Sequence, residues 1–141
     1  MVLIPTRVAA SAIHGCGLFA VEFIPKGTPI WRFLPGFDQE FTPEQRAALP
    51  EPARSHTRHY GFVGPGNLHV FLSGDHACFI NHSESPNTGA SPDAAPPITT
   101  VALRDIAAGE EITCNYWAFD ADAAWKLGQL PRDADSGAGH Q

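Results

Sequence analysis

Residues 79–87 read Phe-Ile-Asn-His-Ser-Glu-Ser-Pro-Asn, and this stretch decides more about the chain than any other. Asn81 and His82 stand directly behind an apolar run at residues 77–80. A buried amide or imidazole is costly without a hydrogen-bonding partner, so such a pair indicates a dedicated site. For His82 alone, the alternative is a core histidine that is satisfied within the chain.

Two other segments carry glycines or polar residues in an informative order. Residues 14–20 read His-Gly-Cys-Gly-Leu-Phe-Ala, and residues 109–116 read Gly-Glu-Glu-Ile-Thr-Cys-Asn-Tyr. The first fits G-x-G-x-x-A, which binds a dinucleotide when it lies between a strand and a helix. Pro25, Gly27 and Pro29 follow too soon for that helix. A plain turn between strands remains, or a loop whose glycines let the backbone approach a ligand.

In this order, the three segments resemble the SET-domain family of protein lysine methyltransferases, in the minimal form of stand-alone bacterial or viral members. The stretch at 81–87 is similar to the family motif N-H-S-C-x-P-N, and the stretch at 109–116 to G-E-E-L-T-x-D-Y. The resemblance covers roughly residues 4–118. It implies a SET fold that is mostly β with short helices, with several small sheets and a C-terminal pseudoknot.

The resemblance also implies a cofactor, S-adenosylmethionine, and its product S-adenosylhomocysteine. In the family the glycine segment lies along the cofactor, and the Asn and His bind it. Carried over to this sequence, the cofactor-binding residues are Gly15, Cys16, Gly17, Leu18, Phe19, Asn81, His82, Tyr116 and Trp125. Asn87 is expected to hold the loop. Trp125 and Phe119 are equally well explained as residues that close the core.

Tyr116 is, by the same resemblance, the catalytic residue. The acceptor must be a neutral amine, and a lysine with a pKa of ~10.4 is neutral in about one molecule in a thousand near neutral pH. Deprotonation therefore costs about 4 kcal/mol. A tyrosine with a pKa of ~10 is a poor base there. We expect Tyr116 to orient the amine while positioning and desolvation supply the acceleration.

Some positions depart from the family pattern. Glu84 stands where the family often has Cys, and Asn115 stands where it usually has Asp. Cys114 stands where a Phe or Tyr often limits the number of methyl groups, so a product beyond monomethyl-lysine is expected. Together with Tyr60 and Trp117, Cys114 completes the predicted substrate-binding residues. For Tyr60 the alternative is an ordinary strand tyrosine.

Length and charge limit the remaining possibilities. The 141 residues have room for one domain and, with 43% apolar residues, for a core. We expect residues 1–130 to form a single SET domain and residues 131–141 a disordered tail. A net charge of −6 without a basic patch disfavours nucleic acid and fits a basic, lysine-bearing protein or peptide partner. Solubility alone explains the charge equally well.

A cytoplasmic location is expected from three absences. No apolar run reaches the ~20 residues of a membrane span, and no signal peptide is recognisable. The cysteines at 16, 78 and 114 form no C-x-x-C pair, which is typical of reduced thiols. His76, Cys78 and His82 could begin a metal site, but a fourth ligand has no clear candidate, so no metal is predicted.

Proline and glycine, 13 of each, divide the chain into short elements. Residues 64–67, Gly-Pro-Gly-Asn, predict a hairpin turn, and residues 91–97 a loop. Strands are expected at residues 18–24, 28–33, 59–63, 68–72, 98–103 and 111–113, the last continuing toward Tyr116.

Two short helices are expected. Thr42 and Gln45 form a capping-box pattern around Pro43, and Pro50 ends that helix. The second helix runs from about residue 120 to 127 and stops before a glycine.

Two functions are compatible with this sequence. The first is methyl transfer from S-adenosylmethionine to a protein lysine. The second is a SET-fold module that has lost transfer and serves in binding or regulation. The presence of Asn81, His82, the glycine segment and Tyr116 favours the first. A homodimer is left open, because some stand-alone members of the family dimerise.

Overall fold

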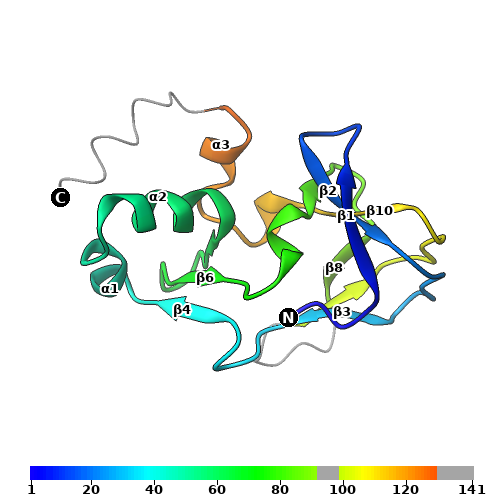
Figure 1. Ribbon diagram of the computed structural model, residues 1–141, viewed down its shortest axis with the longest axis horizontal. Helices are drawn as coiled ribbons and strands as arrows, with labels where there is room; N and C mark the ends of the chain where they lie inside the picture. Colours follow the sequence, from blue (N-terminus) through cyan, green and yellow to red (C-terminus); the bar gives the residue numbers. More distant parts are fainter. Residues whose placement is uncertain (92–98, 130–141) are drawn as a thin grey trace. The chain divides into compact units, whose positions relative to one another are not determined.

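The computed structural model describes residues 1–91 and 99–129, and these contain ten β-strands, three α-helices and two short 3₁₀ helices (Figure 1). Their contacts divide them into two compact units. Unit 1 consists of Met1–Asp38 and Ser73–Asn115. Unit 2 consists of Gln39–Leu72 and the described part of the segment that starts at Tyr116. Short strands and few helices confirm the expected mostly-β fold.

Unit 1 contains a four-stranded sheet in the order β1-β2-β10-β7 and a three-stranded sheet in the order β3-β9-β8. β10 pairs antiparallel with β2 and parallel with β7, so it joins segments that are far apart in the sequence. The threading of a pseudoknot stays a prediction of the resemblance. The elements are β1 Thr6–Ala10, β2 Cys16–Ala20, β3 Pro29–Arg32, η1 His76–Phe79, β7 Asn81–His82, β8 Thr88–Ala90, β9 Thr99–Ala102 and β10 Glu111–Cys114.

The core of unit 1 lies against β2 and β10. Leu18 and Ile112 are fully buried and directly opposite each other in the sheet. Burial of each such side chain stabilises the fold by about 1.5–3 kcal/mol, so this contact fixes the register of the glycine segment against β10. The buried cluster consists of Leu18, Ala20, Ile24, Ile30, Ala102, Ile106 and Ile112.

Unit 2 contains a three-stranded sheet in the order β4-β6-β5, the three α-helices and the 3₁₀ helix η2. The predicted hairpin turn is confirmed, because the amide of Gly64 donates to the carbonyl of His69 at 2.9 Å and β5 pairs antiparallel with β6. The elements are β4 Gln39–Phe41, α1 Pro43–Ala47, α2 Glu51–Tyr60, β5 Phe62–Val63, β6 Val70–Leu72, η2 Tyr116–Ala118 and α3 Ala123–Lys126.

The first predicted helix is confirmed as α1. The amide of Gln45 donates to Oγ1 of Thr42 at 3.1 Å, and the amide of Thr42 donates to Oε1 of Gln45 at 2.9 Å. The second is found as α3, shorter than expected, with Gly128 beyond its end at a φ of 74°. Glycine reaches that conformation without a steric penalty, which is why it ends helices so often.

The strand expected over residues 59–63 is wrong in its first half. α2 extends to Tyr60, and β5 begins only at Phe62. Pro50 ends α1 and also precedes α2, whose first turn contains a second proline, a favoured arrangement at helix starts. The change of direction requires Gly61, since a Cβ there would lie 2.6 Å from the carbonyl oxygen of Thr57.

Other predicted strands are present in shorter form, and some strands were not predicted. β7 has two residues and β4 three, too few for an alternating pattern to appear. The expected strand that continues to Tyr116 ends earlier, because β10 stops at Cys114 and η2 begins at Tyr116. The expected loop at 91–97, apart from Ser91, and the tail at 131–141 lie outside the described residues.

Candidate functional site

Asn81 connects the three sequence motifs within unit 1. The residue is 7% exposed, and its Nδ2 donates to Oε2 of Glu111 at 2.9 Å. The same nitrogen lies 3.1 Å from the carbonyl oxygens of both His14 and Cys16. Carbonyl and carboxylate oxygens only accept hydrogen bonds, so these neighbours fix which end of the amide is the nitrogen. Oδ1 of Asn81 is therefore the end that can meet a further donor.

The glycine segment forms the tight loop between β1 and β2. The amide of Ser11 donates to the carbonyl of Gly15 at 2.8 Å, and Gly15 has a φ of 47°, where side chains are disfavoured. His14 and Cys16 are exposed, so the outer face of this loop is open to solvent. β2 is followed by β3 and not by a helix, which excludes the dinucleotide-binding arrangement.

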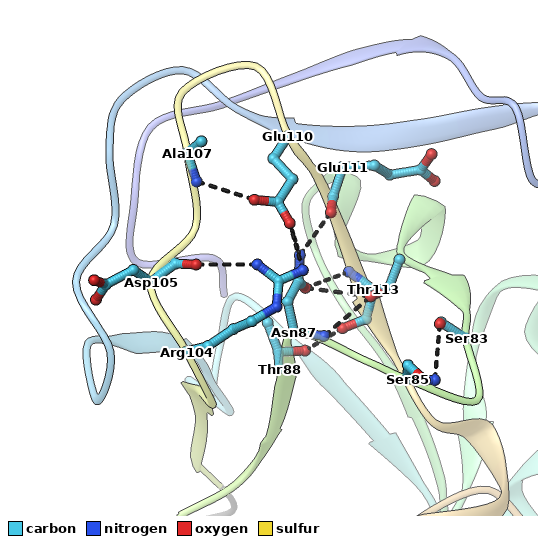
Figure 2. Close-up of polar contacts among 10 residues, drawn as sticks. All are labelled: Ser83, Ser85, Asn87, Thr88, Arg104, Asp105, Ala107, Glu110, Glu111 and Thr113. Atoms are coloured by element: carbon cyan, nitrogen blue, oxygen red, sulfur yellow. Dashed lines mark hydrogen bonds and ion pairs between the residues drawn. The ribbon is translucent and has the colours of Figure 1, made fainter.

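Asn87 fastens the start of β8 to β10 (Figure 2). It is 1% exposed, and its Oδ1 accepts from the amide of Thr113 at 2.8 Å. Its Nδ2 donates to the carbonyl of Glu111 at 2.8 Å, and its own amide donates to Oγ1 of Thr113 at 3.1 Å. This is the holding role expected for Asn87 from the sequence.

The two glutamates before and in β10 have different surroundings. Figure 2 shows their side chains leaving the chain in different directions. Oε2 of Glu110 accepts from Arg104 at 2.5 Å, and Oε1 accepts from the amide of Ala107 at 3.1 Å. The hydrogen bond from Arg104 above all, against the opposing effect of burial, holds the pKa of Glu110 below its ordinary value. Glu111 turns instead toward the glycine loop and Asn81.

His82 lies beside β10 in the parallel pair, in register with Cys114. The amide of Ser83 continues this pairing by donating to the carbonyl of Cys114 at 2.9 Å. The imidazole Nε2 lies 3.2 Å from Oε1 of Glu84, the residue that replaces the family's frequent cysteine. The cofactor role of His82 stays a prediction.

Leu18 and Phe19 are the apolar residues of the glycine segment. Leu18 belongs to the buried core, so packing explains it better than a cofactor contact. Phe19 is half-buried, and the guanidinium carbon of Arg7 lies 5.6 Å from its ring centroid. A cofactor contact of either residue stays a prediction.

Tyr116 and the residues that follow it belong to unit 2. The ring of Tyr116 meets Phe119 edge to face, with centroids 6.1 Å apart, and Nζ of Lys126 lies 5.9 Å from its centroid. The amide of Asp120 donates to the carbonyl of Tyr116 at 2.9 Å. Unit 2 therefore holds the predicted catalytic tyrosine through its own local segment.

An ion pair between the half-buried Lys126 and the buried Asp120 fastens this segment to β5. Nζ of Lys126 lies 2.6 Å from Oδ2 of Asp120 and also donates to the carbonyl of Gly61. Oδ1 of Asp120 accepts from the amide of Val63 at 3.0 Å. Sequence reasoning missed this pair, because its two members are six residues apart and match no helix or strand pattern.

The remaining predicted residues of unit 2 differ in exposure. Trp125 is 2% exposed and packs under Arg58, whose guanidinium carbon lies 4.2 Å from the ring centroid, and against His59. Of the two explanations for Trp125, core packing accounts for this environment, and its cofactor contact stays a prediction. Tyr60 ends α2 and is 45% exposed, and Trp117 is 47% exposed. Their roles toward a substrate also stay predictions.

The described residues contain neither a membrane-spanning helix nor a cluster of metal-binding side chains. No helix in residues 1–91 and 99–129 is long and apolar enough to cross a membrane. In the same part of the chain, no group of three or more His, Cys, Asp or Glu side chains could hold a metal ion.

The chain belongs to the SET domain family, and the model of that family matches residues 15–117. A histone-lysine N-methyltransferase, H3 lysine-4 specific, of Chaetomium globosum is 35% identical over 126 residues. A putative histone-lysine N-methyltransferase 1 of Plasmodium falciparum is 32% identical over 115 residues. These matches cover 79% and 77% of this chain, but it spans only 11% and 2% of those proteins.

Solved structures show the same fold. A putative histone methyltransferase of Plasmodium falciparum aligns with a TM-score of 0.56 at 19% identity, over 82% of this chain and 95% of that one. Polycomb Repressive Complex 2 of Chaetomium thermophilum, in an autoinhibited conformation bound to S-adenosylmethionine, aligns with a TM-score of 0.62 at 21% identity. That alignment covers 89% of this chain and 17% of the other. The expected SET fold is therefore confirmed.

Proposed function

We propose that this chain is a protein-lysine N-methyltransferase that uses S-adenosylmethionine. The observation that carries the proposal is the hydrogen-bonded group around Asn81, in which one amide joins the glycine loop, β7 and Glu111 of β10. Family membership and relatives that are named histone-lysine N-methyltransferases support it.

The residues of unit 1 fit the chemistry of this cofactor. S-adenosylmethionine carries a positive sulfonium and an ammonium group, and its adenine has an amine, so it requires acceptors and negative charge. Oδ1 of Asn81 is such an acceptor, and the carboxylate of Glu111 places a negative charge beside the open glycine loop. When bound, the cofactor supplies an activated methyl group. The half-buried His82 and the exposed backbone of the glycine loop complete the set of candidates for binding it.

Tyr116 is assigned the orientation of the acceptor amine. The neutral form of a lysine amine costs about 4 kcal/mol near neutral pH, and a tyrosine hydroxyl cannot supply that as a base. Its contribution is to accept a hydrogen bond from an N–H of the amine, which leaves the lone pair free and directs it toward the methyl group. The rate of transfer should therefore rise with pH toward about 9, as more of the substrate amine becomes neutral.

The proposed substrate is a basic protein or peptide that carries lysine, such as a histone or a histone-like protein. The net charge of −6 and the names of the relatives favour it. Cys114 is smaller than the aromatic residues frequent at this position, and we propose that more than one methyl group is transferred. A cytoplasmic location and a homodimer stay proposals from the sequence.

Calorimetric titration of S-adenosylmethionine and S-adenosylhomocysteine into the wild type and two variants tests the proposal. Asn81→Ala should lose binding, whereas Asn67→Ala, which removes an exposed amide in the hairpin turn, should keep it. Tyr116→Phe should bind both ligands and fail to methylate a histone-derived peptide. Circular dichroism verifies that each variant is folded. Wild-type protein that binds neither ligand would favour the alternative, a SET-fold module without transfer.

A further inference from the structure

Ser11 lies outside the three motifs, yet its hydroxyl organises the glycine loop. Oγ accepts a hydrogen bond from the amide of Ile13 at 2.9 Å and from the amide of His14 at 3.3 Å. Serine favours this local pattern, in which a side chain replaces a backbone acceptor in a turn. The amide of Ser11 also closes the loop onto Gly15. The hydroxyl of Ser11 thus satisfies two backbone donors of the turn.

The same hydroxyl binds the loop to β10. Oγ of Ser11 lies 2.8 Å and 2.9 Å from the two carboxylate oxygens of Glu111, to which it donates. Asn81 donates to the same carboxylate. Hydrogen bonds to an ionised acceptor are about twice as strong as neutral ones. None of the ion pairs within residues 1–91 and 99–129 includes Glu111, so neutral donors hold its charge.

Gly17 makes room for this carboxylate. A Cβ at position 17 would overlap Oε2 of Glu111 and lie 2.8 Å from its Cδ, closer than real Cβ atoms approach. It would also lie 3.2 Å from Cβ of Ser11. At Gly15 a Cβ would meet nothing within 4 Å, so that glycine is needed for its positive φ instead. Space beside Gly17 is therefore occupied by the protein's own side chain.

We propose that Ser11 and Glu111 are positioning residues that hold the glycine loop in the shape that binds S-adenosylmethionine, an inference that rests on the proposed function. We call these two residues and Gly17 the loop clasp. An exposed loop that is ordered only on binding loses conformational entropy at that moment and binds more weakly. Because the loop clasp orders the loop when the protein folds, this entropy is already lost before the ligand binds. Removal of the loop clasp should weaken the binding of substrate and product forms of the cofactor alike.

Ser11→Ala is the first test, with Thr28→Ala as the matched control. Thr28 also uses its hydroxyl in an exposed turn of unit 1, where Oγ1 donates to the carbonyl of Pro25 at 2.7 Å. We expect Ser11→Ala to bind both ligands about tenfold more weakly by calorimetry. Ser11→Thr, which retains the hydroxyl, should restore most of the affinity. Thr28→Ala should bind like the wild type.

Hydrogen exchange in the protein without ligand is a second test, because it reports the order of the glycine loop and requires neither cofactor nor methyl transfer. The amides of Ile13 and His14 should exchange faster in Ser11→Ala, because they lose their acceptor. Glu111→Gln places an amide opposite two donors and should also weaken ligand binding. In the double variant with Ser11→Ala, the loss of binding free energy should be smaller than the sum of the two single losses. Wild-type protein that binds neither ligand would refute the proposed function. Wild-type binding that Ser11→Ala leaves unchanged would refute the positioning role alone.

Discussion

Asn87→Ala should destabilise unit 1 far more than the loss of one amide usually does. The variant removes the partners of two backbone groups of β10, the amide of Thr113 and the carbonyl of Glu111, both at 2.8 Å from the side chain. A buried polar group without a partner costs about 1–3 kcal/mol, so the two together cost about 2–6 kcal/mol. Because the hydrogen bond to the Glu111 carbonyl is only part-buried, the lower half of this range is expected.

Urea unfolding followed by circular dichroism measures this loss, with Asn67→Ala as the control. Asn67 accepts a single exposed hydrogen bond, from the amide of His69 at 2.9 Å, which water can replace. The free energy of unfolding of Asn67→Ala should therefore fall by less than about 1 kcal/mol. The free energies of unfolding are compared only if the wild type and both variants show the same slope against urea concentration, so that the difference reflects the native state. Equal losses in the two variants would refute the claim that Asn87 fastens β10.

Two further predictions concern charges. Lys126→Met should lower the free energy of unfolding by about 3–5 kcal/mol, because it leaves the buried Asp120 carboxylate without its cation. Glu51→Gln, which breaks an exposed ion pair of α2, should cost less than about 1 kcal/mol in the same urea assay, and similar losses would contradict the distinction. The hydrogen bond from Arg104 is the main cause that lowers the pKa of Glu110 in the folded protein. Glu110 therefore stabilises the fold at pH values above the pKa it has in the unfolded chain, and this stabilisation is lost as the pH falls through its pKa in the folded protein. Between about pH 6 and 3, stability should fall more steeply in the wild type than in Arg104→Ala, and parallel curves would exclude this coupling.

Local signals in the sequence were sufficient for some elements. The capping box at Thr42 and Gln45 depends on residues three apart, and both of its hydrogen bonds are present. The hairpin at residues 64–67 and the glycine after α3 are local in the same sense. The expectation that Asn87 holds the loop came from the family motif, and it agrees with the contacts of the side chain.

Other features depend on contacts between distant segments. β7 has two residues and exists because β10 lies beside it. α2 was missed because Pro50 was interpreted only as the end of one helix and not also as the start of the next. The bond between Ser11 and Glu111 joins residues at opposite ends of the domain, and no spacing within either segment predicts it.

The two glycines of the loop show how one pattern can have two physical causes. From the sequence, either a plain turn or close approach of the backbone to a ligand explained both glycines. The structure assigns Gly15 to its backbone conformation and Gly17 to the space that Glu111 occupies. The G-x-G pattern of a dinucleotide turn has no such carboxylate partner and requires a following helix. The informative pattern is therefore the pair of Gly17 with Glu111, and a chain with the glycines but without that acid would need a different explanation for its loop.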